Sequence, residues 1–588
     1  MALSNGHTPV SAFSVYKVTG SKKRKNKETL LSPNELPIKK EKKHKTKLSN
    51  NAESILIKKK SKSTKTSYKT HETNKPVTKK SLAKKQKGKS NLNDLKTKKK
   101  ISNEEIAPTL IPIETNSDLS EPASNSNQID PTPEVLKLFK WLIAPLKPKE
   151  FLEKYWETEA FHQQRNSGDY YKCILTTERL DSVFREHPLY YTRNVDVVSY
   201  ENGVKEVHNE EGRVVASALY DYYSNGCSIR ILNPQTYVQK VHYLITALQE
   251  YFGSMVGVNV YLTPAGSQGF APHYDDIEAF VLQLEGRKHW KLYKPKGSDV
   301  LARDSSANLK HEDIGEPFME ATLNAGDLLY FPRGTIHEAR TDSEAHSLHI
   351  TVSVYQRNSY ADLLEHILPK ALQEASLNNV EFRKGLPLNY LKYSGFVNRG
   401  LKSEKRKSLI ENVNKLIDTL KEYVNVDLAA DALGRRLMYD SMPPFLSTEE
   451  ANFTSKYDGD FMQDGKIVNR IEIGMDTQIR LVRFYCLRLV VDGDSAKIYY
   501  STENAKYYHG EEEQFLSIDL GLVPCIKKLQ RMYPNYIEVE DLPIEDGVAK
   551  AQLVSDLWER GLLVTNGPLP LAFGDDDDHD DGSFELVE

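Results

Sequence analysis

Two short motifs hold side chains that could bind a metal ion, and the first is Ala-Pro-His-Tyr-Asp-Asp at 271–276. His273 and Asp275 stand two residues apart in it. On a β-strand, residues at i and i+2 point to the same side, so one imidazole and one carboxylate could reach a single metal. By itself the HxD triplet is a weak signal, because chance triplets are common in a chain of 588 residues.

The second motif, Gly-Asp-Leu-Leu-Tyr-Phe-Pro-Arg-Gly-Thr-Ile-His at 326–337, could supply a third ligand. A Gly-Asp turn leads into an apolar strand, a proline and a glycine end it, and His337 follows at its mouth. Two histidines and one carboxylate leave three metal positions open, which is the pattern of non-haem iron(II) oxygenases. His346 and His349 are rival third ligands, but they fall in the next predicted strand and lack this lead-in.

A lysine between the two motifs could bind an anion. Alternation along 287–293 puts Lys288, Trp290 and Leu292 on one side, and the two apolar neighbours predict that this side faces inward. An inward lysine needs an anion to offset its desolvation, and the distal carboxylate of 2-oxoglutarate would supply one. The alternative is a lysine whose stem packs while its ammonium group reaches water.

The elements that must position these residues are short and rich in β-formers. Between about Cys227 and Tyr355 the runs CSIRIL, VNVYLTP, AFVLQLEG, KHWKLY, GDLLYFP and LHITVSVYQ alternate with turn signals. Such spacing predicts a jelly-roll, cupin-like double-stranded β-helix over 133–360. Helices over about 135–142 and 151–161 are expected to cap it.

Downstream, the apolar period becomes helical. Residues 361–445 are predicted to form a helical region that either covers the barrel or pairs with a second copy, since both roles need amphipathic helices. A hairpin signal at Asp492-Gly493 and helices over about 520–532 and 545–560 predict a winged-helix-like domain at 446–573. The chain is therefore expected to be mixed β and α.

The two ends of the chain carry opposite charges. Residues 1–100 contain 28 lysines and Arg24 against six acidic residues, a net charge of +23, although the whole chain carries −3. With almost no aromatic residues, 1–132 is predicted to be a disordered basic arm and linker. Its lysine clusters suit nuclear import and RNA or chromatin binding, or else only solubility. The run DDDDHDD is expected to belong to a disordered acidic tail, 574–588, and not to a metal site.

Four scattered cysteines without a CxxC pair favour a reducing, intracellular setting. No stretch approaches the ~20 apolar residues that span a bilayer, so a soluble protein without a membrane partner is expected.

The stretches HYDDIEAFVLQLEGRKHWKLY and GDLLYFPRGTIH resemble the JmjC oxygenases, and specifically their nucleolar ribosomal-oxygenase branch. That branch has the same order of jelly-roll, helical insert and winged helix, and its lysine-rich arm recurs here. The resemblance implies roles for eight residues. The implied iron(II) ligands are His273, Asp275 and His337; Lys288 anchors 2-oxoglutarate; Asn259, Tyr261 and Ser353 are pocket positions; Arg230 is on the substrate side.

The resemblance also implies an activity that uses O2 and 2-oxoglutarate. The expected reaction is hydroxylation of a histidine of a large-subunit ribosomal protein, demethylation of histone H3 at lysine 4 or lysine 36, or both. A nuclear and nucleolar homodimer is implied as well. A chromatin- or RNA-binding scaffold with a merely structural cupin-like domain is the alternative, and the complete ligand set argues against it.

Overall fold

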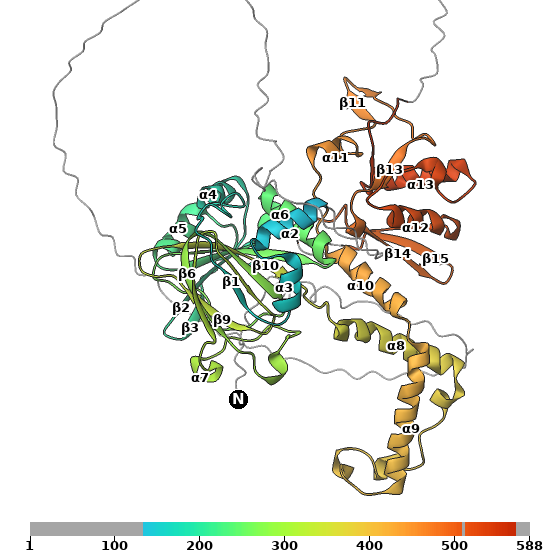
Figure 1. Ribbon diagram of the computed structural model, residues 1–588, viewed down its shortest axis with the longest axis horizontal. Helices are drawn as coiled ribbons and strands as arrows, with labels where there is room; N and C mark the ends of the chain where they lie inside the picture. Colours follow the sequence, from blue (N-terminus) through green and yellow to red (C-terminus); the bar gives the residue numbers. More distant parts are fainter. Residues whose placement is uncertain (1–132, 508–511, 572–588) are drawn as a thin grey trace, which may run out of the picture. The chain divides into compact units, whose positions relative to one another are not determined.

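The computed structural model describes residues 133–507 and 512–571 of the chain (Figure 1). The predictions for the basic arm and linker and for the acidic tail lie outside these residues. Among the helices that are described, none combines the length and the apolar character needed to cross a membrane.

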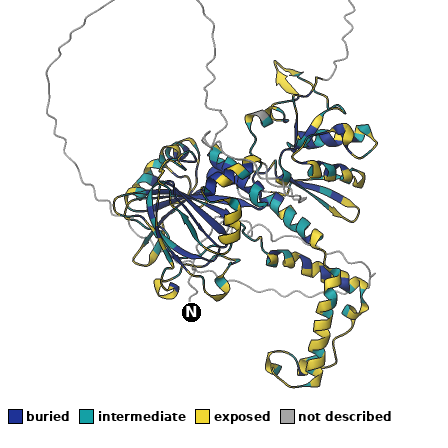
Figure 2. Cartoon of the chain, viewed as in Figure 1, coloured by how far each residue is buried: buried dark blue, intermediate teal, exposed yellow. Residues whose placement is uncertain are grey.

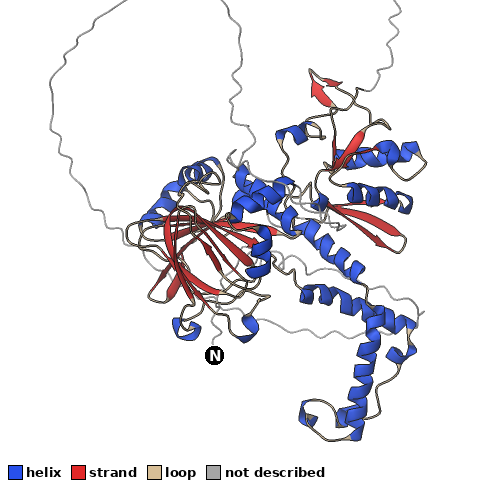
Figure 3. Ribbon diagram, viewed as in Figure 1, coloured by secondary structure: helices blue, strands red, loops and turns tan. Residues whose placement is uncertain are grey.

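A ten-stranded antiparallel sheet forms the first part of the described chain (Figure 3). The strands follow the order β1-β8-β6-β10-β5-β4-β2-β3 across the sheet, and β7 and β9 also pair with β6. The predicted jelly-roll is therefore confirmed. The strands are β1 (Phe161–Gln163), β2 (Val195–Glu201), β3 (Val204–Val207), β4 (Ser228–Leu232), β5 (Val256–Thr263), β6 (Glu278–Tyr293), β7 (Met319–Asn324), β8 (Leu328–Phe331), β9 (Ile336–Arg340) and β10 (Ser347–Val354).

The long strand β6 replaces two predicted strands, AFVLQLEG and KHWKLY. Its first half pairs with β8 and β10, and its second half pairs with β7 and β9. Gly286 lies where the pairing changes, with φ at +63°, and an added Cβ would sit 1.8 Å from the carbonyl oxygen of His346. A glycine is required there, and the sheet passes through it without ending.

Helices cover the sheet: α2 (Pro133–Ile143), α3 (Pro148–Lys154), α4 (Thr177–Glu186), α5 (Ala216–Ser224) and α6 (Gln239–Phe252). Their apolar faces join the buried core (Figure 2). The ring of Phe139 on α2 stacks on Tyr251 of α6 at 4.1 Å between centroids, and Phe280 of β6 packs edge-on to Phe139. Each such ring contributes roughly 1.5–3 kcal/mol on burial, so the core fixes the strands that hold the site.

Two predicted boundaries in this region are wrong. The helix expected over 151–161 ends at Lys154, because Glu157 adopts a left-handed φ of +56° and Phe161 then pairs with Tyr330 of β8. The sheet also begins before Cys227, since β1, β2 and β3 precede it. Strand β1 pairs with the remote strand β8, a contact that local periodicity does not reveal, whereas β2 and β3 form a hairpin with each other across Asn202 and Gly203.

The region after the barrel is helical, with α8 (Tyr360–Asn378), α9 (Glu404–Leu420) and α10 (Val426–Asp440). Helix α8 buries Ile367, Ala371 and Ala375 and contacts α10. Helix α9 buries none of its residues, so it does not cover the barrel.

The last described part has its own apolar core and contains three short sheets. The hairpin predicted around Asp492-Gly493 is formed by β14 and β15. The elements are α11 (Thr448–Asn452), β11 (Phe461–Gln463), β12 (Lys466–Val468), β13 (Gln478–Leu481), β14 (Leu487–Asp492), β15 (Ser495–Tyr500), β16 (Phe515–Ile518), α12 (Val523–Met532), β17 (Ile537–Glu538), α13 (Gly547–Glu559) and β18 (Leu563–Thr565).

Candidate metal centre

The structure brings His273, Asp275 and His337 together, with one potential ligand atom of each lying within 4.8 Å of the others. Nε2 of His273 and Nε2 of His337 each lie 3.9 Å from Oδ2 of Asp275. These three atoms therefore surround one point. The rival histidines are not part of this cluster: His346 is partly exposed beside Glu285, and His349 lines the same cavity as the three ligands without joining their group.

The first motif does not lie on a strand, so the condition under which alternation would turn His273 and Asp275 to the same side is not met. It belongs to the loop between β5 and β6, and a single β-bridge ties it to β9. His273 donates its backbone N–H to the carbonyl of His337 at 3.2 Å, and His337 donates in return at 2.8 Å. Gly334 donates its N–H to the carbonyl of Asp275 at 2.9 Å. Backbone bonds, and not strand alternation, bring the two motifs together.

Backbone carbonyls orient both imidazoles. Nδ1 of His273 lies 2.8 Å from the carbonyl oxygen of Ala271, and Nδ1 of His337 lies 3.1 Å from that of Thr335. A carbonyl only accepts, so each Nδ1 carries the hydrogen and each Nε2 keeps its lone pair for a metal. Burial lowers the pKa of both histidines to about 4, which keeps them neutral. Two neutral imidazoles and a carboxylate fit iron(II).

Beside this cluster, a cavity holds buried polar groups that a co-substrate could satisfy. Lys288 is only 4% exposed, and its Nζ donates to Oγ1 of Thr263 at 3.0 Å. Desolvation lowers its pKa to about 7. Among the described residues, Nε1 of Trp290 and Nδ1 of His349 have no hydrogen-bond partner, although both side chains are buried. A buried ammonium group and two unsatisfied nitrogens suit the far carboxylate of 2-oxoglutarate.

The other predicted site residues line the same cavity: Arg230, Asn259, Tyr261 and Ser353. Arg230 donates from Nε to Oδ2 of Asp196 at 3.1 Å, which fixes its guanidinium group at the wall. The sequence did not reveal that Thr263 accepts a hydrogen bond from Lys288 or that His349 lines the cavity. His349 stacks on Tyr261 at 4.8 Å, and its alternation with Thr351 and Ser353 along β10 is a signal that could have indicated it.

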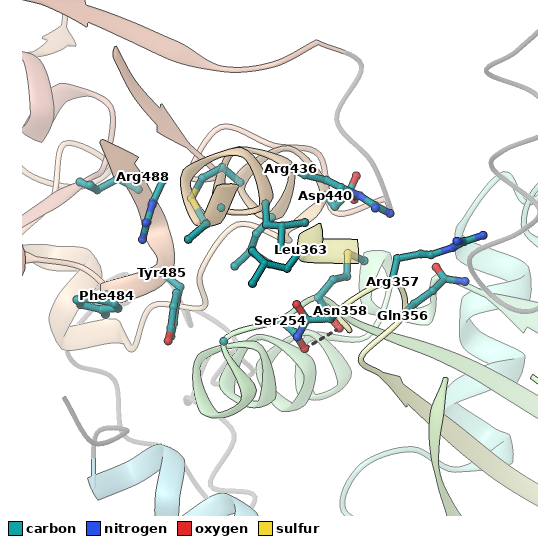
Figure 4. Close-up of a pocket in the computed structure, with 18 of the residues that line it drawn as sticks. Ser254, Gln356, Arg357, Asn358, Leu363, Arg436, Asp440, Phe484, Tyr485 and Arg488 are labelled. Carbon is teal, nitrogen blue, oxygen red and sulfur yellow. Dashed lines mark hydrogen bonds and ion pairs between the residues drawn. The ribbon is translucent and has the colours of Figure 1, made fainter. Parts of the chain in front are cut away.

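A larger cavity lies away from the metal cluster, with about 240 Å³ against about 60 Å³ beside the cluster (Figure 4). Its lining includes Arg357, Arg436 and Arg488, and each forms an ion pair with a carboxylate. Because these charges are already neutralised, this cavity has less to offer a charged ligand. Size therefore does not identify the site, and the unsatisfied groups do.

Family comparisons agree with this geometry. Residues 230–363 match the JmjC domain, and residues 442–569 match the C-terminal winged helix domain of ribosomal oxygenase 1. The protein is an oxygenase of the JmjC class, which uses iron(II) and 2-oxoglutarate.

Curated relatives narrow this class. The bifunctional lysine-specific demethylase and histidyl-hydroxylase NO66 of Aedes aegypti is 44% identical over 73% of this chain and 67% of its own. Ribosomal oxygenase 1 of Gallus gallus is 44% identical over 74% of this chain and 72% of its own length. Ribosomal oxygenase 1 of Danio rerio is 43% identical over 74% of this chain and 80% of its own length. The chain belongs to the family of ribosomal oxygenase 1 and NO66.

Among solved structures, the Escherichia coli ribosomal oxygenase YcfD in complex with cobalt and 2-oxoglutarate is 15% identical. It covers 72% of this chain and 99% of its own, with a TM-score of 0.38. At this score the likeness adds nothing to the assignment.

Proposed function

We propose that this enzyme hydroxylates a histidine of a large-subunit ribosomal protein, with demethylation of histone H3 at lysine 4 or lysine 36 as the second candidate. The observation that carries the proposal is the metal cluster beside a cavity with a buried lysine. The NO66 relative of Aedes aegypti is described as carrying both activities, which supports keeping both candidates.

In this proposal, Nε2 of His273, Oδ2 of Asp275 and Nε2 of His337 hold iron(II). The ammonium group of Lys288 binds the distal carboxylate of 2-oxoglutarate. Asn259, Tyr261 and Ser353 line the same space, and Arg230, fixed by Asp196, faces the substrate. When bound, the metal and 2-oxoglutarate supply, with O2, the oxidising power that converts a substrate C–H bond to C–OH.

The contribution of the chain is orientation and exclusion of water. The backbone carbonyls keep both ring nitrogens aimed at the metal, and the buried wall formed by Trp290 and Phe331 keeps the space dry. The same step on two substrates gives two outcomes. A hydroxylated histidine is stable, whereas a hydroxylated N-methyl group releases formaldehyde and leaves the amine demethylated.

Mass spectrometry of ribosomal-protein and histone H3 peptides after turnover tests the proposal. Gain of one oxygen atom on a histidine is the expected result. Loss of a CH2 unit from methyl-lysine with unchanged histidine peptides would make the second candidate the activity. Absence of both products, without iron-dependent succinate formation, would favour a scaffold.

The affinity for 2-oxoglutarate should depend on pH through Lys288. Its pKa of about 7 in the ligand-free protein means that the charged form is lost as pH rises through 7, and an anion favours that charged form. The dissociation constant should therefore be flat below pH 6 and rise by up to about tenfold per unit above pH 7. Ligand titrations across pH measure it. A Lys288→Arg variant that still binds should lose the dependence, because its charge persists.

We also propose that residues 1–100 direct the protein to the nucleolus and bind RNA. Their net charge of +23 supports contact with phosphate, which releases counterions. Deletion of residues 1–100 should leave peptide turnover intact while nucleolar signal and salt-sensitive RNA binding fall together. Imaging and filter binding measure these. Nucleolar signal retained in the truncated protein would contradict the targeting role.

The helical region is proposed to form a homodimer. Ile410, Val413 and Ile417 of α9 recur at helical spacing and are 45%, 43% and 56% exposed. A stripe of this kind is typical of a helix that meets a second copy. Light scattering should give twice the chain mass, and Ile410→Glu with Ile417→Glu should reduce it to one chain. A monomeric parent protein would contradict the proposal.

A further inference from the structure

The two oxygens of the Asp275 carboxylate face different neighbours. Oδ2 lies 3.9 Å from both metal-facing imidazole nitrogens, whereas Oδ1 lies 3.4 Å from Oγ of Ser305. One oxygen is thus directed to the metal position and the other to a hydroxyl group. A carboxylate that is free to rotate would bind a metal less well, so whatever holds Oδ1 also sets the direction of Oδ2.

Ser305 belongs to a segment that runs beside the first metal motif and is tied to it along its length. Ser306 donates its N–H to the carbonyl of Tyr274 at 2.9 Å, and its hydroxyl accepts the N–H of Tyr274 at 2.9 Å. Leu309 donates its N–H to the carbonyl of Pro272 at 2.8 Å. These bonds fix the hydroxyl of Ser305 next to the carboxylate.

Asp276 holds that hydroxyl in place. Oγ of Ser305 has a single hydrogen, which it shares between Oδ1 of Asp276 at 2.7 Å and Oδ1 of Asp275 at 3.4 Å, and the oxygen accepts the N–H of Asp276 at 3.3 Å. The second oxygen of Asp276 accepts from Nε2 of Gln356 at 2.7 Å. Because Asp276 is only 6% exposed and is held from two sides, the hydroxyl has little freedom to leave Asp275.

The same segment is bound to the start of the helical region. Arg303 donates to Oδ1 of Asp362 at 2.7 Å and to Oε1 of Glu365 at 2.8 Å, both on α8. Arg357, which follows Gln356 in the loop before α8 (Figure 4), forms an ion pair with Asp304. Asp362 is 5% exposed and its other oxygen accepts the N–H of Ser359, so this end of α8 is rigidly capped.

We propose that the 303–306 segment is a positioning element that links α8 to the metal centre, with Ser305 as the positioning residue for Asp275. The inference rests on the metal centre of the proposed function. Arg303 sets the place of the segment from α8, and the Ser305 hydroxyl, aligned by Asp276, keeps one oxygen of Asp275 turned toward the two imidazoles. Metal affinity and the helical region are thereby coupled.

The first test titrates the full-length, metal-free protein with Co(II) and follows the visible absorption of the bound ion. Ser305→Ala should weaken Co(II) binding by about tenfold, the lower end for partners of metal ligands. Ser305→Thr, which keeps the hydroxyl, should restore it. Asn308→Ala is the matched control, because its side chain is exposed on the same segment, and binding should stay within about twofold.

The second test asks whether Arg303 acts through Ser305. Arg303→Gln should weaken Co(II) binding by about threefold, whereas Glu365→Gln, which removes the more exposed partner of the same guanidinium group, should not change it. In the double variant Arg303→Gln with Ser305→Ala, the loss should not exceed that of Ser305→Ala alone. We substitute Arg303 and not its partner Asp362, because Asp362 also caps α8.

Two results would overturn the inference. The first is Co(II) affinity in Ser305→Ala that stays within about twofold of the parent protein while Asp275→Ala loses the metal; the metal centre would then stand and the positioning role would fail. The second is full additivity in the double variant, which removes the link to α8. Undiminished Co(II) binding by Asp275→Ala would instead refute the metal centre itself.

Discussion

Asp275→Ala should reduce turnover to below about a hundredth of the parent rate, because loss of an outer partner of a metal ligand already costs 10–100-fold and this change removes the ligand. The fold should survive. The carboxylate sits beside two neutral imidazoles, and burial raises its pKa, so its removal relieves a desolvation cost and breaks no buried ion pair. Succinate formation measures the rate, and thermal unfolding should show a shift of no more than about 2–4 °C.

His346→Ala is the matched control for this change. His346 is the rival ligand from the sequence, and its imidazole lies 3.4 Å from Glu285 on the surface. Turnover should be unchanged in that variant. Equal losses in both variants would contradict the assignment of the metal ligands, as would normal turnover of Asp275→Ala after removal of metal and reloading with iron.

Lys288→Ala should raise the KM for 2-oxoglutarate by ~30-fold or more, with a smaller change in the metal affinity. Removing one partner of a buried charge pair typically costs 2–5 kcal/mol, and 1.4 kcal/mol corresponds to a factor of ten. In the variant, the distal carboxylate of the co-substrate would face Thr263, Trp290 and His349 without a countercharge. Initial rates over a range of 2-oxoglutarate concentrations measure the effect.

Lys291→Ala provides the control on the same strand. Its side chain is 39% exposed on the opposite side of β6 and lies 3.6 Å from Glu320. An ion pair of this exposed kind contributes little, so the KM should stay within about twofold. A KM for Lys288→Ala no higher than that of Lys291→Ala would place the anchor at another residue.

Local pattern was sufficient for several features. Alternation along 287–293 predicted that Lys288 and Trp290 face inward, and they are 4% and 5% exposed. The hairpin at Asp492-Gly493 formed as expected, since a tight turn fixes the pairing of its own neighbours. The two motifs likewise indicated the three side chains, His273, Asp275 and His337, that lie together in the metal cluster.

The sequence by itself determined which groups could do chemistry, because residue type and spacing fix what a side chain can donate, accept or bind. Only the tertiary structure decided how they meet. Strand alternation would have aligned His273 with Asp275, but His273 is placed by a backbone bridge to His337, 64 positions further along the chain. The hydroxyl group that accepts from Lys288 belongs to Thr263, and the hydroxyl group beside Asp275 belongs to Ser305. Both residues come from other segments of the chain. Such contacts depend on long-range pairing and packing, which periodicity within a short window does not encode.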